Sequence, residues 1–409
     1  MAKLIFINRF FFPDHSATSQ LLTDLAFDLA EIGREIHVVT SRQRYDDPSA
    51  TLAAEEEHRG VRIRRIWTSR FGRANLVGRA IDYLTFYLSA ARLLLKLARE
   101  GDVIVAKTDP PLISVVAAWV AQRRGAVLIN WVQDVFPEVA GRLGVRIMQG
   151  PLGAIAKRLR NYSLRTARAN VVLGERMEAQ VSAESGHSQS TRIIENWSDG
   201  SLIRPQDRGT NALRKLWNLG DRFVVGYSGN MGRAHEFETI LRACDALRED
   251  VGIVFLFIGA GRQRDWIEAE AARRSLDNIV FQPYQPRESL ATSLSAPDVH
   301  LVNLRPFLEG LIVPSKYYGV AAAGRPTIFI GDLDGEIARI VKREDCGLAI
   351  ASGDFEGLTH AIRNLRDDPV LLTAMGRSAR RAFEENHDRP VALAKWSALL
   401  ADISTATKG

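Results

Sequence analysis

Two glycine-containing loops contain residue types that suit the binding of a phosphate. The first, residues 227–235, follows an apolar run and precedes a helical pattern, and it holds Gly229, Asn230, Gly232 and Arg233. Glycine lets backbone N–H groups approach a phosphate, and the start of the next helix adds a favourable dipole. The second loop, residues 259–262, repeats the pattern with Gly259 and Gly261. Glycines also serve turn conformation alone, and neither loop has P-loop spacing, which disfavours a Walker-type hydrolase.

A third loop, residues 307–319, carries opposite charges around a proline. Glu309 lies in a loop just after the predicted strand at residues 299–303 and could accept hydrogen bonds from ligand hydroxyls, and Lys316 supplies a cation for phosphate. The alternative is that both are solvated loop charges. Asp332 and Asp334 superficially resemble a metal-binding motif, but aspartate is a favoured turn residue, so we expect a turn there and no metal site.

These loops require a framework of strands and helices. Short runs rich in Val and Ile alternate with helical-period segments, which predicts βαβ units and parallel sheets. The predicted strands are residues 4–7, 35–40, 61–66, 103–106, 127–131 and 169–173, then 223–227, 251–258, 279–282, 299–303, 327–330 and 347–349. The predicted fold class is therefore α/β, with two Rossmann-like, doubly wound parallel-sheet domains facing a central cleft.

A polar stretch, residues 195–211, separates the two series. We therefore predict one Rossmann-like domain at residues 1–200 and a second at residues 201–385. A last helix at residues 386–409 is expected to cross back to the N-terminal domain.

Composition limits the class of protein. The chain has 409 residues, of which 46% are hydrophobic and 25% charged, and its mean hydropathy is −0.09. These values are typical of a soluble globular protein and exclude a disordered or fibrous chain. Only Cys244 and Cys346 are present, too few for a disulfide framework, and they fit a reducing cytoplasm. We find neither a signal peptide nor 18 consecutive apolar residues.

Positive charge is concentrated in the first half of the chain. The net charge is +6, and residues 1–200 account for all of it. Residues 61–99 contain nine Lys or Arg against a single acid, Asp82, and residues 75–97 combine basic, aromatic and apolar residues. Such a helix can lie on an anionic membrane surface, and the alternative is a helix packed on the sheet with solvated arginines. No recognition motif supports nucleic-acid binding.

The order of several motifs resembles a known family. They are residues 12–18, 107–111, 133–138, 195–197, 229–232, 296–298, and 313–316 leading to 322–326. The chain resembles the family-4 retaining glycosyltransferases of GT-B architecture, particularly the bacterial surface-polysaccharide branch with the colanic acid and N-acetylfucosamine transferases. The likeness covers nearly the whole chain and links it to O-antigen and lipopolysaccharide biosynthesis.

The resemblance implies that the N-terminal domain, residues 1–200, binds the acceptor and that the C-terminal domain, residues 201–385, binds a nucleotide-sugar donor. It also implies roles for individual residues. The donor diphosphate would contact Gly229, Asn230, Gly232, Arg233 and Lys316. The donor sugar and nucleotide would contact Gly259, Gly261, Tyr284, Gly310, Leu311, Ile312 and Ser315, and the acceptor would contact Ala17, Thr18, Asp109 and Gln133. Glu309 is the expected catalytic group on the donor sugar. Asp134 would orient the acceptor hydroxyl, and its alternative role is that of a helix cap or a turn residue.

This sequence also departs from the family pattern. The family's second glutamate falls at Tyr317 or Gly319, according to the alignment, and the Arg and Lys of its first phosphate loop fall at Asn230 and His235. Arg233 and Lys316 are therefore expected to neutralise the diphosphate.

The expected reaction is retaining transfer of a hexosyl unit, N-acetylated or deoxy, from a UDP-sugar to a polyprenyl-diphosphate-linked glycan. We expect no cofactor and no metal, and a cytoplasmic protein attached peripherally to the inner face of the cell membrane. The alternatives are a UDP-sugar 2-epimerase-like enzyme of the same architecture and a non-catalytic sugar- or nucleic-acid-binding module.

Overall fold

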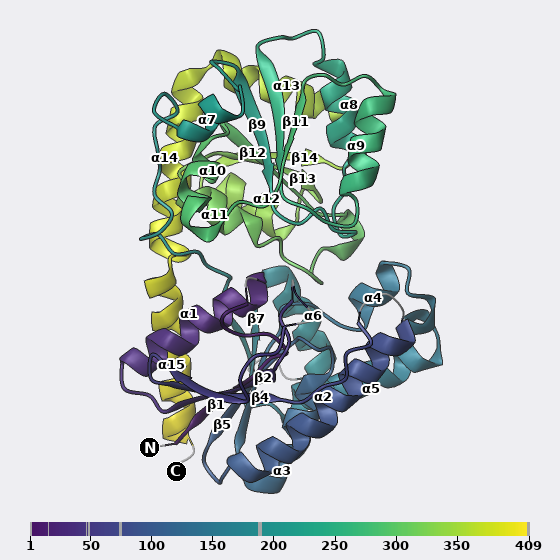
Figure 1. The fold of residues 1–409 in the computed structure, drawn as a ribbon, viewed down its shortest axis with the longest axis vertical. Helices are drawn as coiled ribbons and strands as arrows, with labels where there is room; N and C mark the ends of the chain where they lie inside the picture. Colours follow the sequence, from purple (N-terminus) through teal and green to yellow (C-terminus); the bar gives the residue numbers. More distant parts are fainter. Residues whose placement is uncertain are drawn as a thin grey trace. The chain divides into compact units, whose positions relative to one another are not determined.

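The structure is a computed structural model that describes residues 2–14, 16–45, 47, 50–72, 76–186 and 190–406. His15, Arg73 and Asn75, which belong to the patterns above, lie outside this part. The chain forms two compact units (Figure 1). Unit 1 comprises Met1–Glu195, Gly310–Ile312 and Leu393–Gly409, and unit 2 comprises Asn196–Glu309 and Val313–Ala392. The segment Gly310–Ile312, which the sequence places in the second domain, thus belongs to unit 1.

Unit 1 is built on an eight-stranded sheet with the order β3-β4-β2-β1-β5-β6-β7-β8. All neighbouring strands are parallel except β3 and β4, which are antiparallel. The strands are β1 (Leu4–Ile7), β2 (Ile36–Ser41), β3 (Glu55–His58), β4 (Val61–Ile66), β5 (Val103–Lys107), β6 (Val127–Trp131), β7 (Ala169–Val172) and β8 (Thr191–Ile193).

The helices of unit 1 connect these strands. They are α1 (Ala17–Glu31), α2 (Leu76–Leu97), α3 (Ile113–Arg124), α4 (Glu138–Arg142), the 3-10 helix η1 (Arg146–Gln149), α5 (Pro151–Thr166), α6 (Glu175–Ser185) and the C-terminal half of α15 (Arg389–Ala406). Helix α3 packs against both α2 and α5. Fully buried Phe86 and Ala90 of α2 join Ile113 and Ala117 of α3 in one apolar cluster over the sheet.

Unit 2 is built on a six-stranded, fully parallel sheet with the order β11-β10-β9-β12-β13-β14. Its strands are β9 (Phe223–Ser228), β10 (Ile253–Ile258), β11 (Ile279–Gln282), β12 (Val299–Asn303), β13 (Thr327–Gly331) and β14 (Gly347–Ala351). Strand β10 is buried on both faces, because Phe255 and Phe257 join one apolar cluster while Val254 and Leu256 join another. Two buried faces explain why such strands are continuously apolar.

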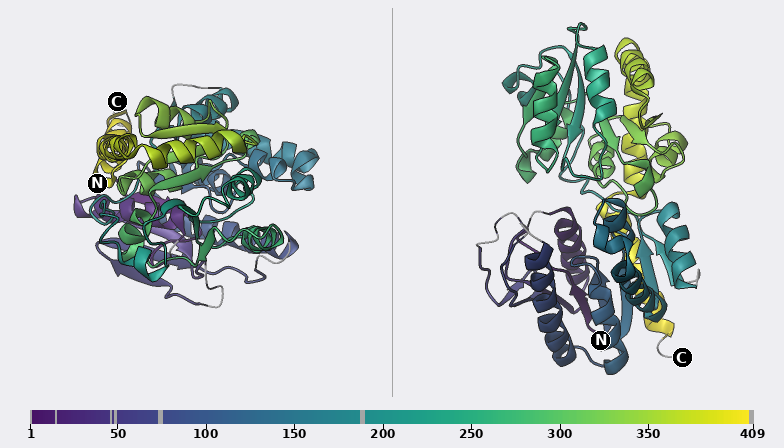
Figure 2. Two further views of the ribbon diagram at one scale, coloured as in Figure 1. Left: turned by 90° about the horizontal axis from the view of Figure 1, so that it is seen from above. Right: turned by 90° about the vertical axis from the view of Figure 1, so that its right-hand side faces the viewer.

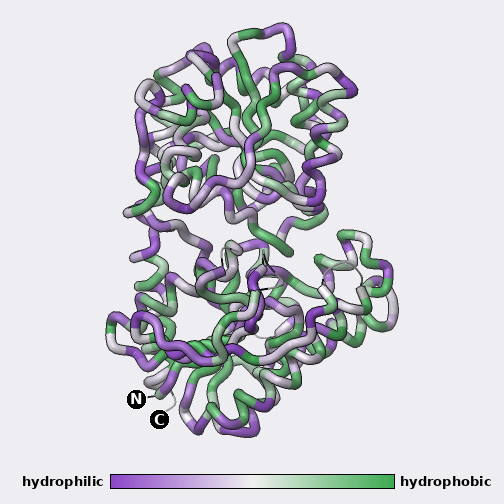
Figure 3. The backbone as a smooth tube through the Cα atoms, viewed as in Figure 1, coloured by the Kyte–Doolittle hydropathy of each residue, from purple (hydrophilic) through white to green (hydrophobic). Residues whose placement is uncertain are grey.

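Helices cover both faces of the unit 2 sheet (Figure 2, right). They are α7 (Ala212–Leu216), α8 (Glu238–Ala246), α9 (Arg264–Arg273), α10 (Leu290–Ser295), α11 (Lys316–Ala322), α12 (Glu336–Arg343), α13 (Phe355–Asp367) and α14 (Pro369–Asn386), with the 3-10 helices η3 (Arg287–Ser289) and η4 (Pro306–Leu308). The tube in Figure 3 shows hydrophobic segments along the strands and hydrophilic ones in many of the connecting loops.

The predicted α/β fold with two parallel sheets is confirmed, and every predicted strand is present within two residues of its bounds. The sequence analysis missed β3 and β8. Strand β3 has the sequence Glu-Glu-Glu-His and is largely exposed, so hydrophobicity could not indicate it. Strand β8 has only three residues.

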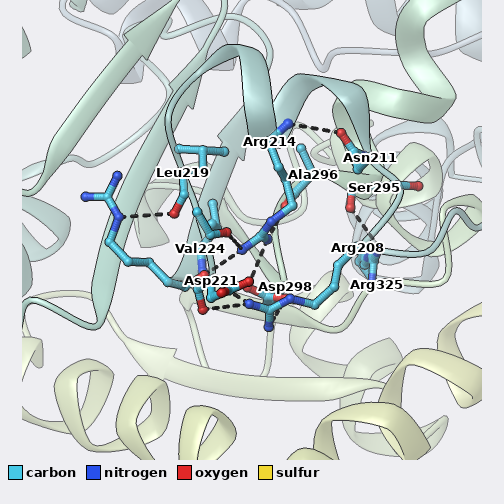
Figure 4. Close-up of polar contacts among 12 residues, drawn as sticks. Arg208, Asn211, Arg214, Leu219, Asp221, Val224, Ser295, Ala296, Asp298 and Arg325 are labelled. Carbon is cyan, nitrogen blue, oxygen red and sulfur yellow. Dashed lines mark hydrogen bonds and ion pairs between the residues drawn. The ribbon is translucent and has the colours of Figure 1, made fainter.

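Three arginines, the buried Arg214 and the partly exposed Arg208 and Arg325, fix the amino-terminal edge of the unit 2 sheet (Figure 4). Asp298 lies next to the start of β12 and accepts the Val224 N–H of β9 at 2.7 Å. Its two oxygens are each 3.2 Å from a guanidinium nitrogen, of Arg208 and of Arg214. Arg214 and Arg325 also donate to backbone carbonyls, Arg325 to those of Gln206 and Ser295 at 2.7 Å each. These cations therefore tie the ends of strands and helices together.

Candidate functional site

The strand orders place a switch point in each sheet. In unit 2 the chain runs from β9 outward to β11 and then returns to β12 on the other side of β9. In unit 1 it returns to β5 on the other side of β1. Loops diverge where the strand order reverses, so a ligand can bind at the carboxyl ends of these strands. The loops after β9 and β12, and those after β1 and β5, are the ones that carry most of the predicted site residues.

The two glycine loops of unit 2 pack directly against each other. The Gly229 N–H donates to the Ile258 carbonyl, and the Met231 N–H donates to the Ala260 carbonyl, both at 2.8 Å. Gly259 has φ +131°, and a Cβ there would lie 2.2 Å from the Gly229 carbonyl oxygen. Only glycine fits such close backbone contact. The glycines of these loops are therefore needed for backbone packing. The N–H groups of Gly229 and Met231, which were expected to face a phosphate, donate instead to backbone carbonyls of the protein.

Lys316 lies across the first glycine loop. A Cβ on Gly229, which has φ +125°, would lie 2.8 Å from Lys316 Cε, so this glycine leaves room for the lysine side chain. Lys316 Nζ is 2.8 Å from His235 Nε2 and 5.0 Å from the centroid of the Tyr227 ring. His235 Nδ1 is 2.7 Å from the Asn303 carbonyl of β12. The loops after β9 and β12 thus meet at a lysine and histidine pair.

Burial changes the acid–base properties of this pair. Desolvation lowers the pKa of His235 to about 3, and the positive charge of Lys316 adds to the effect. Desolvation also lowers the pKa of Lys316 to about 7. Within the described residues, no carboxylate forms an ion pair with Lys316. A cation without a counter-anion at a ligand-binding edge favours an anionic ligand.

Glu309 has a contact that the sequence did not indicate. Its Oε1 accepts the backbone N–H of Glu336, the first residue of α12, at 2.8 Å. A Cβ on Gly335 would lie 2.5 Å from Glu309 Oε2. A carboxylate at a helix N-terminus is favourable because it faces the positive end of the helix dipole. Glu309 therefore has a structural role in holding α12, and a role toward a sugar is a prediction.

The other predicted donor-side residues occupy the same edge of unit 2. Arg233 and Asn230 are both exposed in the first glycine loop. The backbone carbonyl of Asn230 accepts a hydrogen bond from the Tyr227 hydroxyl at 2.9 Å. Tyr284 follows β11 and is exposed, with its hydroxyl 3.5 Å from the Ala260 carbonyl. Ser315 is the N-cap residue of α11, although its side chain makes no capping hydrogen bond.

Gly310, Leu311 and Ile312 lie in unit 1, beside Asp134. The Val135 N–H donates to the Leu311 carbonyl at 2.9 Å, and Asp134 and Ile312 form an isolated antiparallel bridge. Gly310 has φ +75°, and a Cβ there would lie 3.2 Å from the Arg176 carbonyl. These three residues thus contact the segment after β6.

The predicted acceptor residues gather at the carboxyl edge of the unit 1 sheet. Ala17 and Thr18 begin α1, which follows β1. Asp109 follows β5, and its carbonyl accepts the Arg9 N–H of the loop after β1 at 2.6 Å. The buried Gln133 follows β6, and its N–H donates to Thr108 Oγ1 at 3.3 Å. Neighbouring strands β1, β5 and β6 therefore bring all four positions to one edge.

A buried lysine lies at the same edge; the sequence analysis counted it in the motif at residues 107–111 but assigned it no role. Lys107 ends β5 with 1% of its surface exposed, and its Nζ has no hydrogen-bond partner among the described residues. It lies 3.4 Å from the centroid of the Trp131 ring. Burial holds its pKa well below the usual value, against the attraction of Asp134. A lysine that ends an otherwise apolar strand was the signal available in the sequence.

Asp134 and Lys107 influence each other electrostatically. Desolvation and the nearby Asp109 carboxylate raise the pKa of Asp134 to about 6, and Lys107 opposes this rise. A carboxyl group that titrates near neutrality can accept a hydrogen bond from a hydroxyl or hold a proton. Asp134 makes no helix-capping contact, since the N-cap residue of α4 is Pro137.

The aspartate turn after β13 is confirmed. The Asp334 N–H donates to Asp332 Oδ1 at 2.9 Å, an Asx-type turn, and Asp334 also pairs with Arg339. No group of three or more His, Cys, Asp or Glu side chains is arranged to hold a metal ion in the described ranges. Independence from metals remains a prediction.

Two protein families match consecutive parts of the chain. Residues 18–197 match the family described as "Glycosyl transferase 4-like domain", and residues 222–368 match "Glycosyl transferases group 1". The boundary between the matches falls in the stretch where unit 2 begins.

Proteins with similar sequences have related descriptions. "Probable glycosyltransferase WbjE" of Pseudomonas aeruginosa is 26% identical over 311 residues, which span 76% of this chain and 77% of that protein. "Putative colanic acid biosynthesis glycosyl transferase WcaI" of Escherichia coli (strain K12) is 25% identical over 281 residues, 66% of each chain.

Solved structures share the fold over the whole length. Sucrose-phosphate synthase from Thermosynechococcus elongatus superposes with a TM-score of 0.77 at 18% identity, covering 99% of this chain and 100% of that one. Anabaena Alr3699/HepE in complex with UDP-glucose superposes with a TM-score of 0.73 at 14% identity, covering 98% and 100%. At these identities the likeness shows the fold alone.

Proposed function

We propose, on the premise that this chain belongs to the glycosyltransferases of GT-B architecture, that it transfers a hexosyl unit, N-acetylated or deoxy, from a UDP-sugar to a polyprenyl-diphosphate-linked glycan. The two matched families are glycosyltransferase families, which favours transfer over epimerisation and over a binding module. The relative WcaI, which is described for colanic acid biosynthesis, supports a role in bacterial surface-polysaccharide biosynthesis, and WbjE supports glycosyl transfer.

One observation carries the donor assignment. Lys316 is a cation without a carboxylate partner within the described residues, and it lies over the glycine loop at the switch point of unit 2. A nucleoside diphosphate supplies the missing negative charge. HepE, whose structure contains UDP-glucose, shares the fold and supports UDP as the nucleotide.

The proposed mechanism uses electrostatic stabilisation of the leaving group. Negative charge grows on the departing diphosphate while positive charge spreads over the sugar, so Lys316 and Arg233 stabilise the transition state. Glu309 would accept hydrogen bonds from donor sugar hydroxyls. Asp134 would orient the acceptor hydroxyl. In the retaining reaction the hydroxyl attacks from the face that the diphosphate leaves, and the diphosphate oxygen takes its proton.

Two apolar stripes on unit 1 support attachment to a membrane that holds the acceptor. Exposed Val77, Ile81, Leu84 and Leu88 share one face of α2. Exposed Leu152, Ile155 and Leu159 share one face of α5. Exposed Arg92, Lys96 and Arg158 accompany them on these helices. Apolar faces with flanking cations suit the interface of an anionic bilayer. None of the described helices is long and apolar enough to cross a membrane.

Nucleotide release tests the reaction. We would measure release from UDP-, GDP- and dTDP-sugars, with and without a polyprenyl-diphosphate-sugar extract and liposomes. Turnover of one UDP-sugar only with the lipid acceptor is expected. Conversion of a donor into another sugar nucleotide without acceptor would support the epimerase instead, and consumption of a GDP- or dTDP-sugar alone would overturn UDP as the nucleotide.

Vesicle sedimentation tests the membrane surface. The variants Leu84→Asp and Ile155→Asp should each reduce binding to vesicles that contain anionic lipid, because each places a carboxylate on an apolar stripe. Leu216→Asp is the control, since Leu216 is an exposed leucine on α7 of unit 2, outside the two stripes. Equal binding by all three variants and the unchanged chain would contradict this surface.

A further inference from the structure

The hydrogen bonds of His235 determine which of its nitrogens carries the hydrogen. Nδ1 lies 2.7 Å from the Asn303 backbone carbonyl, and a carbonyl can only accept. Nδ1 is therefore protonated, and the neutral ring has Nε2 as an acceptor. Lys316 Nζ, 2.8 Å away, must donate to it. Both the charged and the neutral amine of Lys316 can donate, so the pair persists through titration of the lysine.

The surroundings keep the histidine neutral. Burial is the largest cause of the lowered pKa of His235. The positive charges of Lys316 and Arg305 further disfavour a positive charge on the ring. Arg305 is held in place by a hydrogen bond from its Nε to the Arg233 backbone carbonyl at 3.1 Å. Among the described residues, Tyr227 of β9 also faces the pair; burial raises its pKa, so it is neutral.

The position of Lys316 is thus set by an uncharged acceptor rather than by a carboxylate. A carboxylate partner would hold the lysine protonated and would compete with an anionic ligand. A neutral acceptor orients the amine over Gly229 and leaves its charge uncompensated. Without a ligand, desolvation favours the neutral amine of Lys316. An anion bound beside Lys316 favours the protonated, charged form.

We propose that His235 is a positioning residue for Lys316, and that the donor diphosphate binds together with one proton that Lys316 takes up from solvent. The proposal rests on the proposed donor function. The balance is simple: the neutral amine gains a proton to become the ammonium, and the ammonium pairs with the diphosphate. Affinity for the diphosphate should therefore fall as the pH rises.

The titration of Lys316 in the ligand-free chain is the first test. We would label the lysine side chains with ¹³C, follow them by NMR against pH, and assign Lys316 by its absence in Lys316→Met. A lysine that titrates near pH 7 is expected, as the pKa of about 7 indicates. Titration above about pH 9 would overturn the proton uptake whatever the donor proves to be.

Calorimetry with UDP tests the linkage. Titrations in buffers of different ionisation enthalpy, from about pH 7.5 to about pH 9, avoid the phosphate titration of UDP near pH 6. We expect net proton uptake, and affinity that falls by up to about tenfold per pH unit. Binding without uptake would overturn the inference. If UDP, GDP and dTDP all fail to bind while Lys316 titrates near pH 7, the proposed donor class is overturned instead.

Variants at His235 separate positioning from titration. His235→Leu removes the acceptor and should weaken UDP binding by about three- to tenfold. His235→Gln restores an acceptor and should recover most of that loss. Proton uptake should persist in His235→Gln, because Lys316 carries the proton. Loss of uptake in that variant would assign the proton to His235, and unchanged affinity in His235→Leu would show that the histidine does not position the lysine. Thermal unfolding of each variant checks that it is folded.

Discussion

Two cationic groups of unit 2 differ in their counter-charges: Asp298 pairs with two arginines at the amino-terminal edge of the sheet, whereas Lys316 at the carboxyl edge has no carboxylate partner among the described residues. At the amino-terminal edge, Arg208 and Arg214 each lie 3.2 Å from an oxygen of Asp298, and further donors reach backbone carbonyls (Figure 4). At the carboxyl edge, Lys316 donates to a neutral histidine. We call the amino-terminal edge the saturated edge, because Asp298 supplies the counter-anion for its arginines. We call the carboxyl edge at Lys316 the unsaturated edge, because no carboxylate pairs with this lysine among the described residues.

This difference indicates two roles for charged side chains in unit 2: paired charges stabilise the fold, and an unpaired charge binds a ligand. A buried cation is costly unless it is paired, so the Asp298 carboxylate offsets the burial of Arg214. Lys316 avoids part of that cost by a lowered pKa. Mutations at the saturated edge should therefore change stability, and mutations at the unsaturated edge should change ligand binding and turnover.

The largest expected effect is on stability at the saturated edge. Asp298→Ala leaves Arg214 buried without its carboxylate and removes the acceptor of the Val224 N–H, so the free energy of unfolding should fall by about 3–5 kcal/mol. Urea denaturation followed by circular dichroism measures it. Arg208→Ala is the control, because the side chain of Arg208 is 40% exposed and should contribute less than about 1 kcal/mol. Equal losses in both variants would remove the distinction between a buried and an exposed partner.

At the unsaturated edge, Lys316→Met should lower kcat/KM by about 10²–10³-fold without loss of stability. It keeps the length of the side chain and removes the charge that the diphosphate requires. Lys342→Met, on the exposed face of α12, is the matched control and should leave kcat/KM unchanged. A stability loss in Lys316→Met as large as that of Asp298→Ala would mean that Lys316 is architectural as well.

Glu309 tests whether one residue can contribute both to stability and to turnover. Glu309→Gln keeps an oxygen for the Glu336 N–H and should reduce kcat by about 10- to 100-fold, with stability unchanged. Glu309→Ala should lose the same activity and also about 1 kcal/mol of stability through α12. Steady-state kinetics and urea denaturation separate the two. Full activity in Glu309→Gln would leave Glu309 only its structural role.

The last expected effect is the pH dependence of stability, which is at most about 1.4 kcal/mol per pH unit. The folded pKa of Lys316, about 7, lies below the unfolded value near 10.5, so between these values the unfolded chain binds more protons. The contribution of Lys316 to the free energy of unfolding therefore rises with pH across that window. Comparison of the unchanged chain with Lys316→Met at several pH values isolates it. A difference that does not vary with pH would contradict the lowered pKa.

The sequence allowed much of the framework to be predicted. Alternating apolar runs and helical periods are local patterns, and they identified the strands of both sheets, including the continuously buried β10. The charged β3 was missed because its exposed residues carry no apolar pattern. Gly229, Gly259 and Lys316 were identified because glycine after a strand and a basic residue before a helix are visible along the chain.

The partners of these residues were decided by the tertiary structure alone. Lys316 and His235 are 81 positions apart, and Glu309 and Glu336 are 27 apart, so no local spacing relates them. The strand order brings the loops after β9 and β12 together, and that order depends on how the whole sheet buries its apolar faces. Residue type thus determined which groups carry charge, while long-range packing determined which charges are neutralised within the protein and which remain for a ligand.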